Sequence, residues 1–301
     1  MEKNNPNQLL AQTLIKIDGA YAHATVRAFR ADFTKFIRYC EVNEVDALPA
    51  TPDAVALFVT HLSQKDFASA YIRRIVASIS TIHKLNRYVD PTHDPDVKLS
   101  VRRMHRLIGR FAHQVRPINK EILDRMVAAT DTSLKGLRDR ALISIAYDTL
   151  CRRSEIVSLL VEDLRIDGDT MTGRILLRRS KTDQEAIGKW LPLRSSTMLA
   201  IEAWLIQALI KEGPLFRGIT RGNNIRGQLG SGQVGRIYKD IAASIGLDRK
   251  LVKGISGHSM RVGAAQDLMK SGASLPEIMV RGRWKKVDTV MRYLEESPLG
   301  I

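Results

Sequence analysis

The chain of 301 residues is long enough for two domains, and an apolar content of 44% allows a sizeable core. It has no run of 18 or more apolar residues, so it lacks the signature of a transmembrane helix. The N-terminus, Met1 to Pro6, does not follow the pattern of a signal peptide. Two cysteines, Cys40 and Cys151, are too few for a disulfide framework. We therefore expect a cytoplasmic protein.

The formal net charge of +15 is the strongest functional signal in the composition. Residues 1–115 hold 16 Lys or Arg and 11 Asp or Glu, and residues 116–301 hold 31 and 21, so both halves are positive. Apolar residues recur throughout, which argues against a disordered basic arm. Because a basic excess attracts polyanions, the charge favours a nucleic-acid-binding protein.

The first 110 residues show apolar residues at helical spacing. We expect helices over 24–40, from 52 onward, over 69–87 and over 99–110. Thr51 is a plausible N-cap of the second, with Pro52 in its first turn. The expected buried positions of the last two helices are Ile72, Ile75, Val76, Ile79 and Ile82, and then Met104, Leu107 and Ile108.

Basic residues recur on a second face of these last two helices. On one helix such a face is usually ordinary solvated surface, but two in one small bundle favour contact with the DNA backbone. The predicted DNA contacts are Arg73, Lys84, Arg87, Arg102 and Arg106.

A linker is expected at residues 111–117, because Pro117 disfavours helix at Arg116. It would separate a helical domain, 1–110, from a second domain, 118–301. The sequence of the second domain first predicts helices over 134–149 and 151–160, and then strands near 164–166, 174–178 and 189–193. Further helices are expected over 195–210, 233–245, after 258, 276–282 and 287–294. The expected fold is mainly α, with a mixed α+β second domain that carries a small antiparallel sheet.

Several residues of the second domain suit phosphodiester cleavage. Fixed cations must meet the charge on the non-bridging oxygens, a nucleophile must attack in line, and an acid must protonate the leaving oxygen. Guanidinium groups suit the first task, because their fork binds two phosphate oxygens. The candidates, in chain order, are Arg152, Lys181, His258 with Arg261 three residues later, Trp284 and Tyr293. No metal is expected, because His258 is the only histidine after residue 115.

Each of these residues alone is a weak signal, but their order, Arg, Lys, His-x-x-Arg, Trp, Tyr, resembles the active site of the tyrosine recombinases, or phage integrase family. Gly257-His258-Ser259-Met260-Arg261-Val262-Gly263-Ala264-Ala265 resembles the Cre-like branch in particular, as does Leu275-Pro276-Glu277-Ile278-Met279 followed by Gly282-Arg283-Trp284. The likeness covers about residues 117–294. The helical first half resembles, more loosely, the family's SAM-like core-binding domain.

The resemblance implies a role for each residue. Tyr293 would attack the scissile phosphate and form a 3′-phosphotyrosine, while Arg152 and Arg261 hold the non-bridging oxygens. His258 would assist proton removal from Tyr293, Lys181 would protonate the leaving 5′-oxygen, and Trp284 would donate its indole N–H or pack the pocket. Glu155 matches a supporting acid. Arg153 is an alternative to Arg152, although the spacing of three residues to Glu155 favours Arg152.

The resemblance also implies partners: double-stranded DNA with inverted-repeat half-sites, a homodimer on each site, a homotetramer at synapsis and association with the nucleoid. It implies no metal or other cofactor and no ATP. Only eight residues follow Tyr293, and Pro298 interrupts them, so we expect the C-terminal docking helix of Cre-like enzymes to be short or absent. Two other functions remain open: a type IB topoisomerase or hairpin-forming resolvase, and a non-catalytic DNA-binding regulator.

Overall fold

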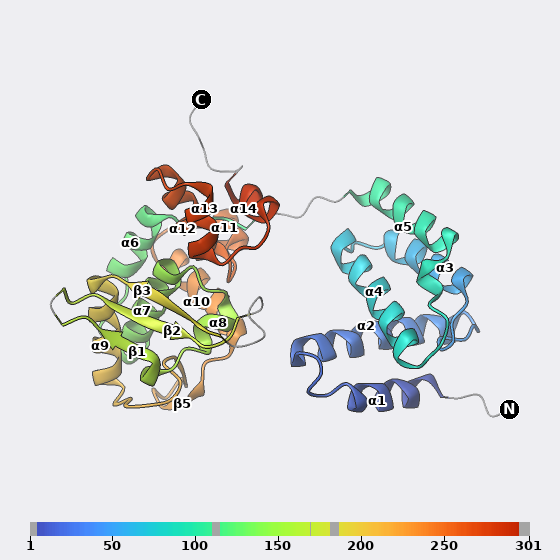
Figure 1. The fold of residues 1–301 in the computed structure, drawn as a ribbon, viewed down its shortest axis with the longest axis horizontal. Helices are drawn as coiled ribbons and strands as arrows, with labels where there is room; N and C mark the ends of the chain where they lie inside the picture. The colour runs from blue at the N-terminus through green and yellow to red at the C-terminus, as the bar shows by residue number, and fades with distance from the viewer. Residues whose placement is uncertain (1–4, 110–114, 169, 181–186, 295–301) are drawn as a thin grey trace. The chain divides into compact units, whose positions relative to one another are not determined.

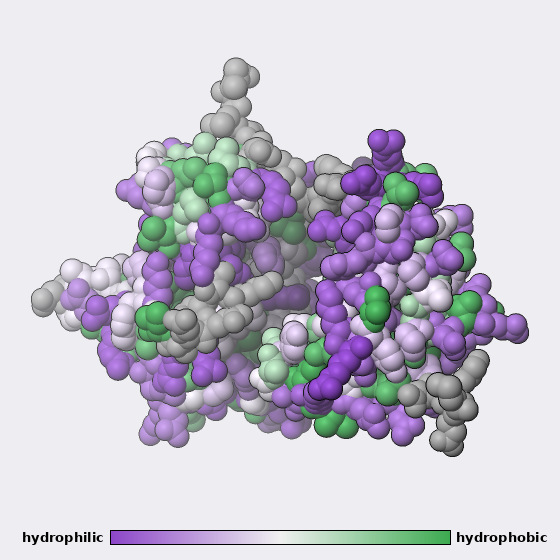
Figure 2. Space-filling view, turned by 45° about the vertical axis from the view of Figure 1, so that its right-hand side comes forward, coloured by the Kyte–Doolittle hydropathy of each residue, from purple (hydrophilic) through white to green (hydrophobic). Residues whose placement is uncertain are grey.

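The computed structural model describes residues 5–109, 115–168, 170–180 and 187–294. The chain divides into two compact units, Met1–His113 (unit 1) and Gln114–Ile301 (unit 2) (Figure 1). Helices dominate both units, and a small antiparallel sheet lies in unit 2, so the expected fold class is confirmed. None of the helices within these described ranges is both long and apolar enough to cross a membrane. The visible surface is mostly hydrophilic, with small scattered apolar patches (Figure 2).

Unit 1 is a bundle of helices around one aromatic and aliphatic core. Phe33, Phe36 and Phe58 meet there with the isoleucines of one helix face, Ile72, Ile75, Ile79 and Ile82, all of which are fully buried. Thr51 caps the third helix by accepting a hydrogen bond from the Ala54 N–H, at 3.2 Å. The elements of unit 1 are α1 (Pro6–Lys16), α2 (His23–Val42), α3 (Pro52–Ser63), α4 (Ser69–Leu85), the 3-10 helix η1 (Pro91–His93) and α5 (Pro95–Ile108).

The helix expected over 99–110 differs from the prediction in two respects. It begins earlier, at Pro95, because the Asp94 side chain accepts from the Asp96 N–H and caps it. Leu107, which was expected to face inward, is 68% exposed. The residues of α5 that pack into the core are Val97, Val101, Met104 and Ile108, spaced four, three and four apart, and Leu107 lies outside this stripe.

A histidine lies in the core of unit 1 as a neutral ring. The Ala50 N–H donates to Nε2 of His83 at 3.0 Å, so Nδ1 carries the proton and donates to the Ile79 carbonyl at 2.8 Å. Burial lowers the pKa of His83, and the hydrogen bond to Ile79 and the nearby charge of Asp90 oppose that shift. The folded chain therefore resists protonation of His83 more than the unfolded chain does.

This histidine should make the stability of unit 1 depend on pH. Its pKa is lower folded than unfolded, so the unfolded state binds the extra proton, and stability falls as pH drops below about 6.5. We expect the slope to be at most about 1.4 kcal/mol per pH unit for this one group. Urea unfolding of the full chain between pH 7.5 and 5.5 measures it. In His83→Gln the slope should be smaller, and an equal slope would contradict the prediction.

Unit 2 contains the remaining helices and all the strands within the described residues. Its helices are α6 (Lys120–Ala128), α7 (Leu134–Thr149), α8 (Arg153–Val157), the 3-10 helix η2 (Val161–Asp163), α9 (Ser195–Gln207), α10 (Ser231–Ser244), α11 (Arg249–Gly254), α12 (Ser259–Lys270), α13 (Leu275–Gly282) and α14 (Val287–Leu294). Its strands are β1 (Leu164–Ile166), β2 (Gly173–Leu177), β3 (Lys189–Leu193), β4 (Arg217–Ile219) and β5 (Ile225–Gln228). Helices α12, α13 and α14 gather at one end of this unit (Figure 1).

The three strands expected from the sequence form one antiparallel sheet in the order β1-β2-β3. Leu164 pairs with Ile175, and Ile175 pairs with Leu191. Ile175 and Leu191 are buried, as are Leu177 and Leu193 at two-residue spacing, so one face of the sheet packs on the core of the unit. Lys189, at the start of β3, donates to the Val280 carbonyl of α13 at 2.9 Å and so links the sheet to that helix.

In place of the helix expected over 151–160, the structure has the much shorter α8, which covers only Arg153–Val157. Leu150 adopts a left-handed conformation with φ 51° and Arg152 is extended, so a sharp turn separates α7 from α8. Helices α1 and α11 and the β4-β5 hairpin were not expected from the sequence.

Part of the predicted linker packs on unit 2, and residues 111–114 of it lie outside the described residues. The Arg116 N–H donates to the Gly254 carbonyl and the Ile118 N–H to the Ser259 carbonyl, both at 3.0 Å. This segment crosses α12 so closely that a Cβ on Gly263 would lie 1.9 Å from the Ile118 carbonyl oxygen. The close crossing requires glycine at position 263.

Candidate active site

The turn between α7 and α8 places Arg152 beside Glu155. The Arg152 N–H donates to Oε2 of Glu155 at 2.9 Å, and its guanidinium Nη1 donates to Oε1 at 2.6 Å. The spacing of three residues produces this pair, because a residue at the N-cap faces the third residue of the helix. Glu155 is buried, whereas Arg152 keeps part of its side chain exposed. The pair therefore holds a partly accessible guanidinium in one orientation.

Arg261 comes from the first turn of α12 and is only 2% exposed. Its two terminal nitrogens donate to the carbonyls of Leu150 and Gly282, and its guanidinium stacks on the Trp284 ring at 4.2 Å from the centroid. Burial, together with the charges of Arg152 and Arg283, lowers the pKa of Arg261 to about 10. It remains charged at neutral pH, and repulsion by Arg152 and Arg283 adds to the effect of burial on its pKa.

His258 immediately precedes α12 and is half-buried. Burial and the neighbouring charges of Arg261, Arg153 and Arg152 lower the pKa of His258, while Glu155 acts in the opposite direction. The imidazole is therefore neutral near pH 7 and able to accept a proton. Its backbone N–H donates to the Ser256 hydroxyl at 3.2 Å, which fixes the turn into α12.

Trp284 and Tyr293 lie next to each other at the end of the unit formed by α12, α13 and α14. Their ring centroids are 5.8 Å apart at an interplanar angle of 54°. Trp284 is buried and Tyr293 half-buried, and Gln266 of α12 donates to the Tyr293 carbonyl at 2.8 Å. Both rings belong to a small apolar cluster with Leu150, Ile278, Val290 and Leu294. Trp284 thus contacts both Arg261 and Tyr293.

The position of Trp284 depends on Gly282. A Cβ at position 282 would lie 1.8 Å from Cζ3 of the indole, so any larger residue must displace the ring. Gly282→Ala is expected to destabilise the protein by about 1–3 kcal/mol, the usual cost of overpacking a core. Thermal unfolding and the near-ultraviolet circular dichroism of the tryptophans measure this effect. An unchanged melting temperature and spectrum would show that the ring does not lie on this glycine.

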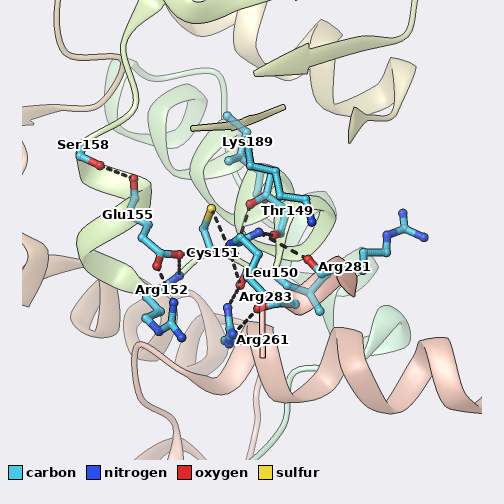
Figure 3. A network of polar contacts seen from close by, with 12 residues as sticks. Thr149, Leu150, Cys151, Arg152, Glu155, Ser158, Lys189, Arg261, Arg281 and Arg283 are labelled. Atoms are coloured by element: carbon cyan, nitrogen blue, oxygen red, sulfur yellow. Dashed lines mark hydrogen bonds and ion pairs between the residues drawn. The ribbon is translucent and has the colours of Figure 1, made fainter. Parts of the chain in front are cut away.

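Figure 3 shows a residue that the sequence analysis left without a role, Arg283. Its guanidinium donates to Oε2 of Glu155 at 3.0 Å and to the Thr149 carbonyl at 3.0 Å. Burial opposes ionisation of Glu155, but the hydrogen bonds from Arg152 and the charge of Arg283 outweigh it and lower the pKa of Glu155. Arg283 adjoins Trp284 in the sequence, but its partner Glu155 lies 128 residues away, so no local pattern revealed the contact.

The structure thus brings together five of the six predicted catalytic residues, namely Arg152, His258, Arg261, Trp284 and Tyr293, with Glu155 beside them. Lys181, the sixth, lies between β2 and β3 in the chain, outside the described residues. Arg153, the alternative to Arg152, is exposed, and its side chain packs over Gly257. Within the described ranges, no group of three or more His, Cys, Asp or Glu side chains could hold a metal ion.

The predicted DNA contacts lie in unit 1 and have exposed side chains: Arg73 and Lys84 on α4, Arg87 just after it, and Arg102 and Arg106 on α5. Lys84 is also paired with Asp90 at 3.0 Å, and Ser80 donates to the same carboxylate. The charge of Lys84 is therefore partly compensated within unit 1, whereas no ion pair is recorded within the described residues for the other four.

The sequence and the fold of this chain are similar to those of known proteins. The model of the phage integrase family matches residues 116–298. An integrase/recombinase XerD homolog of Selenomonas ruminantium is 30% identical over 97% of this chain and 87% of its own. The recombinase Cre of Escherichia phage P1 is 26% identical over 91% and 84%. The chain therefore belongs to the phage integrase family, the tyrosine-type site-specific recombinases, and the resemblance seen in the sequence is confirmed.

Solved structures agree with this fold. A lambda integrase fragment, residues 75–356, solved as a dimer bound to a COC′ core site, matches with a TM-score of 0.64. The match covers 98% of this chain and 96% of that one at 14% identity. The Tn1549 transposon integrase in complex with circular intermediate DNA matches with a TM-score of 0.63 at 12% identity, over 97% and 95% of the two chains. At these identities the likeness concerns the fold.

Proposed function

We propose that this protein cleaves and rejoins DNA at specific sites through a covalent 3′-phosphotyrosine at Tyr293, without metal or ATP. The observation that carries the proposal is the surplus of guanidinium groups around Arg261, whose guanidinium stacks on Trp284, the ring that packs against Tyr293. Arg152 and Arg283 donate to one buried carboxylate, Glu155, and Arg261 lies near enough for the charges of all three to act on it. The described part of this cluster therefore has three arginines for one carboxylate. A phosphodiester placed there would supply the missing negative charge.

The proposed reaction assigns each group one task. The Tyr293 hydroxyl oxygen forms a bond to phosphorus while the bond from phosphorus to the 5′-oxygen breaks. Arg152 and Arg261 bind the non-bridging oxygens as charge builds on them, which also removes the need for a metal ion at this position. The neutral His258 takes the proton of the tyrosine, and Lys181 gives one to the leaving 5′-oxygen.

Rejoining is the same step in reverse. A 5′-hydroxyl attacks the phosphotyrosine, a bond to a 5′-oxygen forms again, and the tyrosine leaves with its proton restored. The phosphotyrosine bond keeps the energy of the phosphodiester, so no ATP is required. When the attacking hydroxyl comes from a second DNA site, the result is recombination.

The DNA contacts belong to the same proposal. We assign residues 1–110 as the helical DNA-binding domain and 118–301 as the catalytic domain, with Arg73, Lys84, Arg87, Arg102 and Arg106 on the phosphate backbone. A dimer would occupy two inverted half-sites and a tetramer would form at synapsis, on the nucleoid. Lambda integrase was solved as a dimer on a core site, and XerH on a palindromic difH substrate. Because phosphate contacts dominate, binding should weaken steeply as salt rises.

A covalent-trapping assay tests the proposal directly. Duplexes that the protein binds, selected from the DNA around its gene for short inverted repeats, are nicked so that the 5′-hydroxyl fragment diffuses away after cleavage. The expected result is a protein–DNA complex that survives SDS. Exchange of strands between two such sites would identify a recombinase, and relaxation of any supercoiled plasmid would identify a topoisomerase. Binding without a covalent complex would identify a regulator and overturn the proposal.

A further inference from the structure

Arg283 occupies a backbone position that suits glycine. It is the C-cap of α13 and adopts a left-handed conformation with φ 58° and ψ 44°. Side chains other than glycine are disfavoured there, because Cβ approaches the following carbonyl. The arginine is nevertheless buried, with only 7% of its side chain exposed. Its Nε is also buried and meets no acceptor within the described residues. A residue that tolerates these penalties is more readily explained by function than by stability.

The guanidinium of Arg283 joins three segments that are distant in the chain. From the end of α13 it reaches the Thr149 carbonyl at 3.0 Å and the Leu150 carbonyl at 3.3 Å, both at the end of α7. It also reaches Oε2 of Glu155, in α8, at 3.0 Å (Figure 3). Among the side chains labelled in Figure 3, Arg283 alone donates hydrogen bonds both to the left-handed turn after α7 and to the buried carboxylate.

Two of the acceptors of Arg283, Glu155 and the Leu150 carbonyl, are shared with the arginines assigned to the phosphate. Glu155 also accepts two hydrogen bonds from Arg152, through the backbone N–H and Nη1. The Leu150 carbonyl also accepts from Arg261. Arg283 is therefore linked to Arg152 through Glu155 and to Arg261 through the Leu150 carbonyl. Movement of either acceptor would move the guanidinium that it orients.

We propose that Arg283 is a positioning residue for strand cleavage, which fixes Arg152 through Glu155 and Arg261 through the Leu150 carbonyl. The inference rests on the proposed function, because its effect is on the two guanidinium groups that would hold the scissile phosphate. A misplacement of about 1 Å in such a group can cost on the order of 100-fold in rate. Losing Arg283 should therefore slow the chemical step without changing the surface that binds DNA.

The charge of Arg283 also keeps Glu155 ionised. Burial raises the pKa of this carboxyl, while the hydrogen bonds from Arg152 and the charges of Arg283 and Arg152 lower it. Among the residues that the structure describes, the charge of Glu155 also acts on His258 and Arg261 from α12 and on Cys151 from the turn after α7. Without Arg283, Glu155 should take up a proton at higher pH and then lose its hold on Arg152.

The experiment compares Arg283→Gly and Arg283→Lys with wild type and with Arg281→Ala. Glycine is chosen because it adopts φ 58° without strain, so the backbone turn can persist. Lysine keeps the charge but loses the planar fork. Arg281 is a neighbouring exposed arginine in α13, and its replacement controls for loss of one positive charge nearby. Single-turnover formation of the covalent complex on a nicked site is measured from pH 4 to 8.5, together with the Kd for DNA and the melting temperature.

We expect Arg283→Gly to cleave about 10- to 100-fold more slowly than wild type at neutral pH, with an unchanged Kd for DNA. As the pH is lowered, the rate of Arg283→Gly should begin to fall at a higher pH than that of wild type, because its Glu155 takes up a proton at a higher pH. The titration of His258 is common to all four proteins and does not produce this difference. Millimolar guanidinium ion should restore part of the rate to Arg283→Gly alone. The cleavage rate of Arg283→Lys should lie between those of wild type and Arg283→Gly. Arg281→Ala should cleave at the wild-type rate.

Equal rates and equal acid limbs in Arg283→Gly and wild type would overturn the proposal. A loss of rate that follows the melting temperature, with no shift of the acid limb and no rescue, would also overturn it, since a purely structural residue would behave in that way. If Arg283→Gly does not fold, the acid limb of Arg283→Lys decides between the same outcomes.

A wild-type protein that forms no covalent complex would contradict the proposed function instead. Acid unfolding without DNA then tests Arg283 by itself. The pKa of Glu155 is lowered in the folded state, so Glu155 contributes stability that is present above its unfolded pKa and is lost as pH falls through its folded pKa. That loss should be smaller in Arg283→Gly or, if that variant does not fold, in Arg283→Lys, and an unchanged loss would overturn the role given to Arg283.

Discussion

Tyr293→Phe is expected to bind DNA as the wild-type protein does and to form no covalent complex with it. The variant loses the oxygen that we propose attacks phosphorus, and removal of a catalytic nucleophile costs on the order of 10⁶-fold in rate. The ring itself remains, so the contact with Trp284 at 5.8 Å is kept, as is the hydrogen bond from Gln266 to the backbone carbonyl. Denaturing gels of the nicked substrate measure the covalent complex, and native gels measure binding.

Tyr147→Phe is the matched control. Tyr147 lies in α7 and donates its hydroxyl to Asp267 at 2.5 Å. Burial and the carboxylate of Asp267 raise the pKa of Tyr147, so its hydroxyl stays protonated and is a poor nucleophile. Its loss should cost about 1–3 kcal/mol of stability, as for a buried hydrogen bond to a charged group, and leave covalent trapping in place. A covalent complex in Tyr293→Phe would show that another residue attacks the DNA.

Arg152→Ala should reduce the rate of cleavage by about 10²–10³-fold, the usual effect of removing one preorganised donor to a developing oxyanion. Glu155 keeps Arg283 as a partner in this variant, so the buried carboxylate is not left alone and the fold should persist. The measurement is single-turnover cleavage at saturating DNA, so that weaker binding does not contribute. Arg152→Lys should recover only part of the rate, because lysine lacks the fork that binds two oxygens.

Arg153→Ala separates the two adjacent arginines. Arg153 is exposed on the first turn of α8, and no hydrogen bond or ion pair is recorded for it within the described residues. Its replacement should lower DNA affinity slightly and change the rate far less than Arg152→Ala does. If Arg153→Ala were the slower of the two variants, Arg153 would be the phosphate ligand and Arg152 a partner of Glu155 only.

Regular periodicity in the sequence predicted most of the fold. The isoleucines of α4 recur at three and four residues and are all buried, and the three strands of the main sheet lie within about one residue of their expected bounds. Elements with weaker patterns were missed. The strands β4 and β5 contain Gly218 and Gly227 and are half-buried or exposed, so they lack the alternation that marks a strand. In α5, periodicity alone could not decide whether Leu107 is buried, because that depends on which face of the helix the other helices of unit 1 cover.

The sequence by itself predicted which residues would carry the chemistry, because guanidinium, imidazole, indole and phenol groups in this order and spacing are specific. It also determined the pair of Arg152 and Glu155, which are three residues apart. Only the tertiary structure decided what holds those residues in place. The Arg261 guanidinium donates to the carbonyls of Leu150 and Gly282, which are 111 and 21 residues away. The Arg283 guanidinium donates to Glu155, which is 128 residues away. Such contacts depend on how α7, α12 and α13 pack and on a left-handed turn at a leucine, and neither has a local signature in the chain.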